Sequence, residues 1–599
     1  MNTLPPEGSI TNTEHGLLVA FGEFLRQHGL LDRLRLVPVP PKTQGFKPQD
    51  KLIEFLAGIT RTCGGAGVSG IEHLQDLNYG PRPLIRDSTV AQAWGLAGFA
   101  HFTTIGRTWA RCDAQTVTAT EAAIPAFSRP FLHTTVRELL RRGQPLIYDL
   151  DLTGQAVSST STTYPEAAFG WMNDQVQLGY QLARVSLSPR AGERLWLAGF
   201  HHPGNTLSSD CLRELITAAE VQTGVRPRRR VELVIERIDH QQALMARWQR
   251  LAEQQQAKRD RLQVTRERLI GQLYQAEHTP KALISRQKQA RLRQQVTGWR
   301  KRLPKVTQEL AKAQQWPAQH QASAQSHATR LTELRAWQAQ LEADNQANPN
   351  PPDHVEARMD AGFTSGEHLA WLLEMGYWPN TKAPNGRTAT ALLLGLPSAD
   401  WQAVGANAEM ALVGEYQMHG CPYPLTVAVE RFKVGRTYKY ATLVRYGPAP
   451  KLAVWFAHYN ARQTLEAGNK EMKGTFHVQH LMSRSPAGIR LQVLFTGLAA
   501  NVVRWCRPWL TDCAAEPTPR LKRTLNSPKQ LVRVAANSPA LVQHTSAGLA
   551  LRFASVSALP DATLFLRGVR AFQLPLRFHD PYPIASDATK PALNAHYLR

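Results

Sequence analysis

The segment from about Asp239 to Gln346 places the strongest constraint on how this chain can fold. Its composition shifts to Gln, Arg, Lys, Ala and Leu. Apolar residues recur in it at alternating four- and three-residue spacing, at Leu292, Val296, Trp299, Leu303, Val306, Leu310 and Ala313, and later at Leu331, Leu334 and Leu341. This spacing is the seam of a helix that packs against another helix. Pro304 predicts a kink, and breaks at HTPKA and QWPAQ predict three helices in an antiparallel bundle.

The charge of the chain indicates a polyanionic partner. Its 599 residues have a formal net charge of +23, and between Gln241 and Gln346 there are 19 Lys or Arg against 8 Asp or Glu. Nucleic acid is the first candidate and an acidic membrane surface the second, and solvation of the helices alone would also explain the charge. No run of about 18 uninterrupted apolar residues is present, and the N-terminus lacks the features of a signal peptide, so we expect a soluble, intracellular protein. The six cysteines are scattered without a CxxC pair, which favours core thiols over a zinc ribbon or a disulfide framework.

The segment PLIYDLDLTGQAV, residues 145–157, predicts a buried strand with Asp149 and Asp151 on the same side. Two acids in a core strand are costly unless charge, hydrogen bonds or a metal ion compensates them. Further along the chain, QLGYQLARVSL and ERLWLAGFHHPGN predict strands, SSDCLRELITAAE a helix, and VELVIERI another strand. Three strands, a helix and a fourth strand are the opening of an α/β core.

A polar helix face is predicted in YNARQTLEAGNKEMKG, residues 459–474. At about 100° per residue, Tyr459, Arg462, Glu466 and Lys473 fall on one side of a helix. Such a face suits a surface that binds phosphate groups and a divalent metal, although a solvated face with intrahelical ion pairs has the same pattern. The apolar segments on both sides, the strand-like KLAVWFAHYN and the longer HLMSRSPAGIRLQVLFTGLAANVVRWC, place this helix beside a core.

The spacing Y-x2-R-x3-E-x6-K resembles the signature of one branch of bacterial insertion-sequence DDE transposases. The resemblance implies an RNase H-like catalytic core in which Glu466 is the third metal-binding carboxylate. It also implies two Mg²⁺ ions, for which Mn²⁺ substitutes, and a role for Tyr459, Arg462 and Lys473 in holding the phosphates of the transposon end. Two aspartates must then lie upstream, each at the end of a strand.

The first aspartate of the family is often followed, one residue later, by Thr or Ser. The sequence Asp151-Leu152-Thr153 fits this pattern, so we assign the role to Asp151 and keep Asp149 as the alternative. A strand-end aspartate that caps a turn at Gly154 is the non-functional interpretation.

The second aspartate is assigned to Asp360, because RMDAGF, residues 358–363, resembles the family's strand-end R-x-D-[SA]-G-F. Small residues after the carboxylate leave space for metal and phosphate. Asp239, at the end of VELVIERI, is a weaker candidate because no Gly-Phe follows it. A capping or turn role is the ordinary alternative for Asp360.

The expected fold class is therefore α/β: an RNase H-like core interrupted by a helical coiled-coil insertion and a β-rich insertion, with an N-terminal helical domain. The expected divisions are 1–115 (helical, end-binding, with a candidate helix–turn–helix from Gly67 to Leu96), 116–239 (core), 240–346 (coiled coil), 347–384 (core), 385–450 (β-rich), 451–512 (core) and 513–599 (no assigned role). In the resembling branch an aromatic residue of the β-rich insertion can stabilise a flipped base, and Trp401 is the candidate by location.

The expected function is metal-dependent cleavage at transposon ends and strand transfer into target DNA. The implied partners are double-stranded DNA, both terminal inverted repeats and target, and a second copy of the chain in a paired-end complex; no membrane is expected. The implied location is cytoplasmic and nucleoid-associated. An RNase H-like nuclease, a domesticated DNA-binding protein, and a non-catalytic coiled-coil scaffold that binds nucleic acid remain alternatives.

Overall fold

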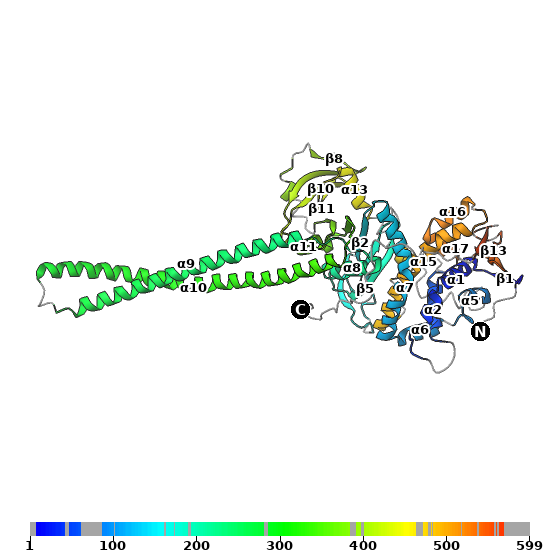
Figure 1. The fold of residues 1–599 in the computed structure, drawn as a ribbon, viewed down its shortest axis with the longest axis horizontal. Coiled ribbons are helices and arrows are strands. Elements are labelled where there is room, and N and C mark those ends of the chain that lie inside the picture. Colours follow the sequence, from blue (N-terminus) through cyan, green and yellow to red (C-terminus); the bar gives the residue numbers. More distant parts are fainter. Residues whose placement is uncertain are drawn as a thin grey trace. The chain divides into compact units, whose positions relative to one another are not determined.

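The computed structural model describes residues 7–567, apart from 42–46, 61–86, 101, 161–162, 173, 190–192, 281–284, 384–390, 394, 397–399, 463–470, 477, 479–480, 482, 517, 536–537, 556, 558 and 560–561. The chain folds as two compact units, one made of Met1–Arg228 with Asn350–Arg599 and the other of Arg229–Pro349 (Figure 1). The predicted mixed α/β class is confirmed. Most of the candidate helix–turn–helix lies outside the described residues.

The first unit is built on a ten-stranded mixed sheet. Its central strand, β2 (Leu146–Ala156), pairs antiparallel with β4 (Gln175–Leu187) and parallel with β6 (Val355–Arg358). Strand β5 (Leu195–Pro203) pairs antiparallel with the other edge of β4, and β7 (Trp378–Lys382) pairs parallel with β6. The core order is therefore β5-β4-β2-β6-β7, with the hairpin strand β3 (Ala168–Met172) also on β4.

Strand β2 is buried on both faces, as expected for a strand at the centre of a mixed sheet. Tyr148 points to one face, where its hydroxyl contacts Thr223 Oγ1 of helix α8 (Ser208–Thr223) at 2.8 Å. Because side chains alternate along a strand, Asp149 and Asp151 point to the opposite face. The predictions of strands at β2, β4 and β5 and of helix α8 are confirmed.

The β-rich segment extends this sheet. Strand β11 (Thr437–Arg445) pairs with β7, and β10 (Leu425–Val434), β9 (Ala408–Tyr416) and β8 (Gln402–Ala403) follow in order. The connections between β6 and β7 are the 3₁₀ turn η3 (Ala361–Phe363) and helix α11 (Gly366–Glu374). The predicted β-rich insertion is thus continuous with the central sheet through backbone hydrogen bonds.

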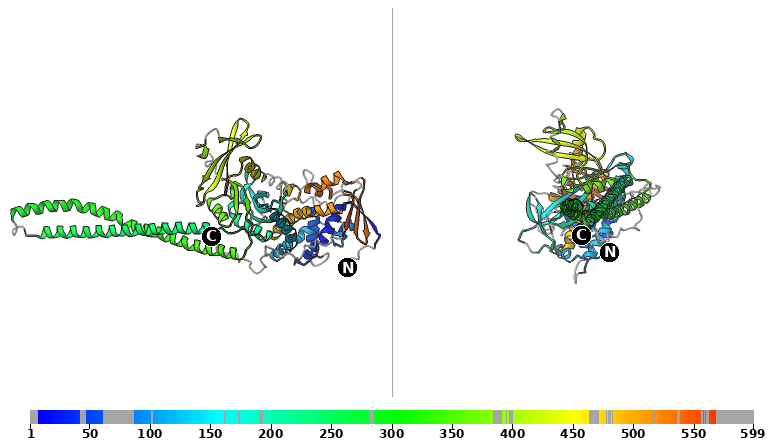
Figure 2. Two further views of the ribbon diagram at one scale, coloured as in Figure 1. Left: turned by 45° about the horizontal axis from the view of Figure 1, so that its top comes forward. Right: turned by 90° about the vertical axis from the view of Figure 1, so that its left-hand side faces the viewer.

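A helical core joins the two ends of the chain. It contains α1 (Gly16–Gln27), α2 (Leu30–Arg35), α3 (Asp50–Thr60), α5 (Ser88–Ala93), α6 (Phe102–Arg111), α7 (Ala114–Arg141), α15 (Pro486–Cys513), α16 (Pro519–Leu525) and α17 (Pro528–Ala535). Strand β1 (Ile10–Thr13) pairs with β12 (Ala540–Thr545), which continues into β13 (Gly548–Phe553) and β14 (Thr563–Arg567) (Figure 2). The C-terminal segment, for which we predicted no role, therefore completes the fold of the N-terminal helices.

Helix α15 is the one described helix long and apolar enough to cross a membrane by length and composition. Of its most apolar window, 78% is buried inside the structure. Trp196 of β5 packs against Gly497 of this helix, where a Cβ atom would lie 2.6 Å from the indole nitrogen. These contacts are those of a core helix.

Two predicted strands are helices. VELVIERI begins α9 (Val231–His278), and KLAVWFAHYN forms α13 (Leu452–Asn460). The fourth core strand is β6 instead. The prediction of one helix from 459 onward is also wrong at its start, because α13 ends at Asn460 and Ala461 caps it. Tyr459 therefore lies in the last turn of α13, and Arg462 lies beyond it.

The second unit is a hairpin of two long helices, α9 and α10 (Arg286–Gln346), which run side by side in both views (Figures 1 and 2). Arg300–Glu277, His320–Trp248, His327–Gln241 and Asp344–Arg229 contacts follow one another along it, as an antiparallel register requires. The prediction of three helices is wrong, because Pro304 and Pro317 both lie inside α10. The residues at four-three spacing continue through Pro317 and His320 to Ala324. Packing of these residues against α9 stabilises the helical conformation of α10 on both sides of Pro317.

Candidate functional site

The pairing of β2 with β6 brings Asp151 near Asp360. The prediction of two strand-end aspartates is wrong for Asp151, which lies in the middle of β2, whereas Asp360 follows the end of β6. In the parallel pair of β2 and β6, Asp149 is opposite Arg358, so the chain positions two residues further on lie beside each other. Strand β6 ends at Arg358, and Asp360 then caps η3, where its Oδ1 accepts a 2.9 Å hydrogen bond from the Gly362 N–H. Residues 209 positions apart in the sequence therefore meet at one place.

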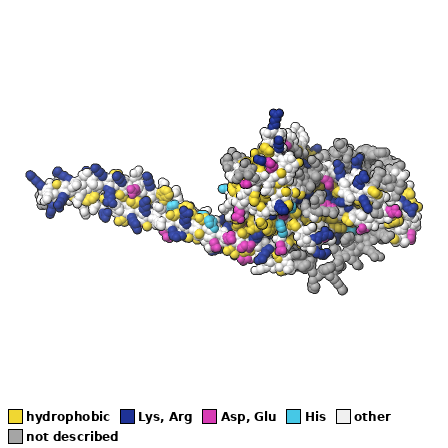
Figure 3. All heavy atoms as spheres, turned by 90° about the horizontal axis from the view of Figure 1, so that it is seen from above, with side chains coloured by type: hydrophobic (Ala, Val, Ile, Leu, Met, Phe, Trp, Pro, Cys, Tyr) yellow, Lys and Arg dark blue, Asp and Glu magenta, His cyan; other side chains and the backbone are white. Residues whose placement is uncertain are grey.

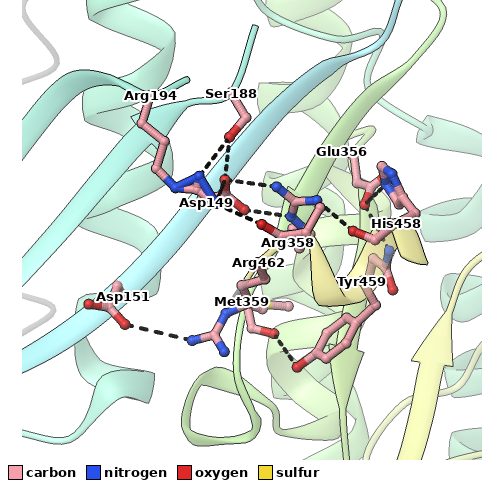
Figure 4. A network of polar contacts seen from close by, with 12 residues as sticks. Asp149, Asp151, Ser188, Arg194, Glu356, Arg358, Met359, His458, Tyr459 and Arg462 are labelled. Carbon is pink, nitrogen blue, oxygen red and sulfur yellow. Dashed lines mark hydrogen bonds and ion pairs between the residues drawn. The ribbon is translucent and has the colours of Figure 1, made fainter. Parts of the chain in front are cut away.

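Arg462 joins the two carboxylates. Its Nη2 lies 3.6 Å from Asp151 Oδ1 and 3.2 Å from Asp360 Oδ2, so these two oxygens are at most 6.8 Å apart. Figure 4 shows the Asp151–Arg462 contact and the arginine approaching from beyond α13. The structure thus brings together three of the six residues that the sequence singled out.

The two acids differ in their surroundings. The Asp151 side chain is 9% exposed, whereas that of Asp360 is 37% exposed and so faces an open side. Burial of the carboxyl raises the pKa of Asp360, the Arg462 charge lowers it, and the Asp151 charge raises it again, with a net upward shift. The raised pKa means that the surroundings disfavour the ionised form of Asp360, chiefly because its carboxyl is buried.

Asp149, the alternative to Asp151, is held in an ion-paired network. Arg358 donates from Nε to Oδ1 at 2.6 Å and from Nη2 to Oδ2 at 2.9 Å, and Arg194 Nη2 lies 3.3 Å from Oδ2 (Figure 4). Ser188 Oγ also donates to Oδ2. Burial alone would raise the pKa of Asp149, but the Arg358 hydrogen bonds and charge hold it below its usual value. Both Asp149 oxygens therefore accept hydrogen bonds, whereas the Asp151 oxygens lie 3.4 and 3.6 Å from Arg184 and Arg462. The choice of Asp151 over Asp149 stays a prediction.

The same network fixes the end of α13. Arg358 Nη1 donates to the His458 carbonyl at 2.6 Å, and the His458 ring Nε2 lies 2.8 Å from both Glu356 oxygens. Burial would raise the pKa of Glu356, but the hydrogen bond and charge of His458 lower it. Strand β6 therefore anchors His458, in the last turn of α13 and four residues before Arg462.

Tyr459 is buried and does not offer its hydroxyl to solvent. The hydroxyl donates to the Met359 carbonyl at 3.4 Å, and burial raises the pKa of the phenol to about 12. Lys382 Nζ lies 5.4 Å from the centre of the ring. In this structure Tyr459 braces the residue that precedes Asp360, whereas its predicted contact with phosphate stays a prediction.

Lys473 is half-buried and within electrostatic reach of Asp151. Burial lowers its pKa, the Asp151 charge raises it, and the Arg184 charge lowers it, with a net downward shift. Arg184 itself comes from β4, and its Nε lies 3.4 Å from Asp151 Oδ2. Arg184 was not identified from the sequence as part of the site. Its position within the apolar strand segment QLARVSL could have indicated it, because a buried arginine needs a carboxylate partner.

Glu466 lies outside the described residues, so its predicted position beside the two aspartates remains a prediction. Asp239, the weaker candidate for the second aspartate, lies within α9 in the other unit. Among the residues that the structure describes, no three His, Cys, Asp or Glu side chains form a group able to hold a metal ion. The predicted metal-binding role of Asp151 and Asp360 stays a prediction.

Trp401 belongs to a polar cluster at the β-rich end of the sheet. The Arg431 guanidinium lies 4.1 Å from the centre of its ring and 5.0 Å from that of Tyr438, and Arg431 Nε pairs with Glu409 at 2.6 Å. The indole is partly exposed. Its predicted contact with a flipped base stays a prediction.

Comparison of the chain with known protein families and with curated proteins finds no match in either.

Proposed function

We propose that this protein is a DDE transposase, which cuts DNA at the ends of a mobile element and joins them to target DNA. The observation that carries the proposal is the shared contact of Asp151 and Asp360 with Arg462. The sequence pattern requires two aspartates beside the Y-R-E-K segment. An ordinary capping role for Asp151 or Asp360 does not require the two acids to share a contact.

The topology supports an RNase H-like core. Strands β2, β4 and β5, helix α8 and the parallel strand β6 occur in the expected order, with the short hairpin strand β3 inserted between β2 and β4. The hairpin unit interrupts this series between α8 and β6, and the β-rich strands follow β7. Both interruptions fall between core elements, so the core order is preserved.

The donor set fits divalent metal ions. Carboxylate oxygens are the ligands that Mg²⁺ prefers, and two oxygens at most 6.8 Å apart suit two ions about 4 Å apart. Asp151, Asp360 and Glu466 would hold the ions, which supply an activated water or 3′-hydroxyl and stabilise the leaving oxygen. Arg462 would then exchange its carboxylate contacts for a phosphate oxygen, which suits its planar guanidinium.

The direct test is cleavage of DNA that carries the sequences flanking the gene, in Mg²⁺ or Mn²⁺. We expect Asp360→Asn and Glu466→Gln each to abolish strand cleavage while end binding is nearly unchanged, because an amide keeps the shape of the acid but not its charge. Asp239→Asn, which changes an acid of α9, is the matched control and should cleave like the parent. Full activity of Asp360→Asn would reject the proposal.

A nuclease that does not transpose is the second candidate, because the same carboxylates serve both reactions. A strand-transfer assay with pre-cut ends and a target plasmid separates the two. Joined products indicate a transposase, and cleavage without joining indicates a nuclease. Binding without either reaction would favour the domesticated DNA-binding protein or the non-catalytic scaffold.

The proposed partners follow from this function. They are duplex DNA, as terminal inverted repeats and as target, and a second copy of the chain, because two ends must be paired before joining. The proposed location is the bacterial cytoplasm, in association with the nucleoid.

A further inference from the structure

The net positive charge of the helical hairpin is confined to the half that includes the end of α9 and the start of α10. Between 258 and 312 there are 15 Lys or Arg and 4 Asp or Glu, whereas 229–257 and 313–349 together have 7 of each. The entire excess therefore lies in the distal half, defined here as 258–312. Figure 3 shows Lys and Arg side chains gathered toward that end of the hairpin.

Most of these distal cations are available to a ligand. In the described part of the distal half, only Arg259 and Arg300 form ion pairs, with Asp260 and Glu277. Eleven other lysines and arginines are exposed and have no ion-pair partner. Helices of the proximal half instead carry balanced charge, including the Arg330–Glu333 pair. Solvation alone would not require one half to be neutral and the other strongly basic.

The shape of the distal half suits a linear polyanion. At about 1.5 Å per residue, its two helical stretches are roughly 30 and 40 Å long, close to the 34 Å of one turn of duplex DNA. The seam positions Val306 and Leu310 are buried between the helices. Val264, Ile270 and Tyr274 of this half are exposed, but its eleven exposed cations outnumber them, which favours a polyanion over a membrane interior. Like charges also oppose the pairing of this half with the same half of a second copy.

We propose that the distal half of the hairpin binds the phosphate backbone of duplex DNA without reading its sequence, and that the neutral proximal half is a spacer. The proposal rests on the proposed function, since it gives the DNA substrate a second contact surface. The spacer separates the basic half by about 40 Å of helix from the residues where the hairpin joins the rest of the chain.

The test compares two variants of equal charge change in the full-length protein. The distal variant is Arg268→Gln, Arg293→Gln, Arg302→Gln and Lys305→Gln, and the proximal control is Arg247→Gln, Arg250→Gln, Arg330→Gln and Arg335→Gln. All eight side chains are exposed, and glutamine is a good helix former, so both variants should keep the hairpin. Circular dichroism checks that they do.

Affinity for a mixed-sequence duplex of about 40 base pairs is measured against salt. Each lost phosphate contact removes about 0.9 from the log-log slope, so the distal variant should lose up to about 3.6 and the proximal control almost nothing. Equal slopes for the parent and the distal variant would overturn the proposal while leaving the proposed function intact. Absence of duplex binding by the parent would instead contradict both.

Two further measurements test two alternative binding partners of the distal half. Flotation with vesicles containing phosphatidylserine tests an acidic membrane, and sedimentation at low and high salt tests a second copy of the chain. Binding to vesicles that exceeds binding to duplex, or self-association that the distal variant abolishes without a change in DNA affinity, would contradict the proposal.

Discussion

At the scale of single residues, the buried acid Asp149 explains how the site is kept in shape. Its carboxylate has no exposed surface and is paired with Arg358 across neighbouring strands. Breaking a buried pair by removing one partner typically costs about 3–5 kcal/mol, because the other charge is left without compensation.

We therefore expect Asp149→Asn to lower the free energy of unfolding of the first unit by several kcal/mol in urea titrations. Asp239→Asn should change it by less than about 0.5 kcal/mol, as for most exposed positions. Adding Arg358→Gln to Asp149→Asn should cost less than the sum of the single changes. Additive losses would show that the pair does not act as a unit.

Asp360 makes the stability of the protein depend on pH. Its pKa is raised in the folded protein, so the folded state binds more protons than the unfolded state between the usual aspartate pKa and the raised value. The contribution of Asp360 to the free energy of unfolding is therefore lost as the pH rises from the usual aspartate pKa through the raised pKa.

In metal-free buffer, Asp360→Asn should accordingly melt no lower than the parent at neutral pH. Any advantage of the variant should disappear as the pH falls below the usual aspartate range, where the parent carboxyl is protonated as well. Melting curves across pH 3 to 8 measure this difference. A variant that is less stable than the parent at pH 7 but not at pH 3 would reverse the sign and contradict the assignment of a raised pKa.

At the scale of elements, the turn after β6 places Asp360 against helix α8. A Cβ atom on Gly362 would lie 2.8 Å from Ser208 Oγ and 3.1 Å from Asp360 Oδ1, both closer than ordinary contacts. A side chain at position 362 would therefore force Ser208 or Asp360 to move where this turn passes the start of α8.

Gly362→Ala should displace Asp360, with a loss of stability of about 1–3 kcal/mol and a larger proportional loss of cleavage. Gly298→Ala is the control, because nothing lies within 4 Å of its added methyl, and it should be slightly stabilising. Adding Ser208→Gly to Gly362→Ala should recover part of both losses. Full cleavage by Gly362→Ala would show that the turn does not position the acid.

The sequence predicted some elements correctly and others not, for physical reasons. Strands β2 and β4 are long, apolar and bounded by turns, so their pattern had one interpretation. In VELVIERI, the residues Val231, Val234, Ile235 and Ile238 also have the spacing of a helix face, and the seam of the hairpin determined the outcome. In α13 the buried residues Leu452, Trp455 and Tyr459 repeat every three to four positions, which the apolar run concealed.

The site was predictable only in part. Short motifs identified Asp151, Asp360 and Arg462, because each has a characteristic neighbour or spacing. The partner of Asp149 could not be identified, because Arg358 lies 209 residues away and only the parallel pairing of β2 and β6 brings it near. The bracing role of Tyr459 likewise depends on where α13 ends.

At the scale of the whole molecule, the chain combines a carboxylate site in one unit with a basic helical hairpin in the other. The central claim is that Asp151 and Asp360 hold divalent metal ions. Fe²⁺ that replaces Mg²⁺ generates hydroxyl radicals with ascorbate and peroxide, and these cut the protein backbone close to the bound ion.

Mapping those cuts by mass spectrometry tests the claim without knowledge of the DNA sequence. We predict cuts near residues 149–151 and 358–362 that Mg²⁺ suppresses and that Asp360→Asn removes, whereas Asp239→Asn leaves them unchanged. Cuts confined to other segments, or the same cuts in Asp360→Asn, would contradict the claim.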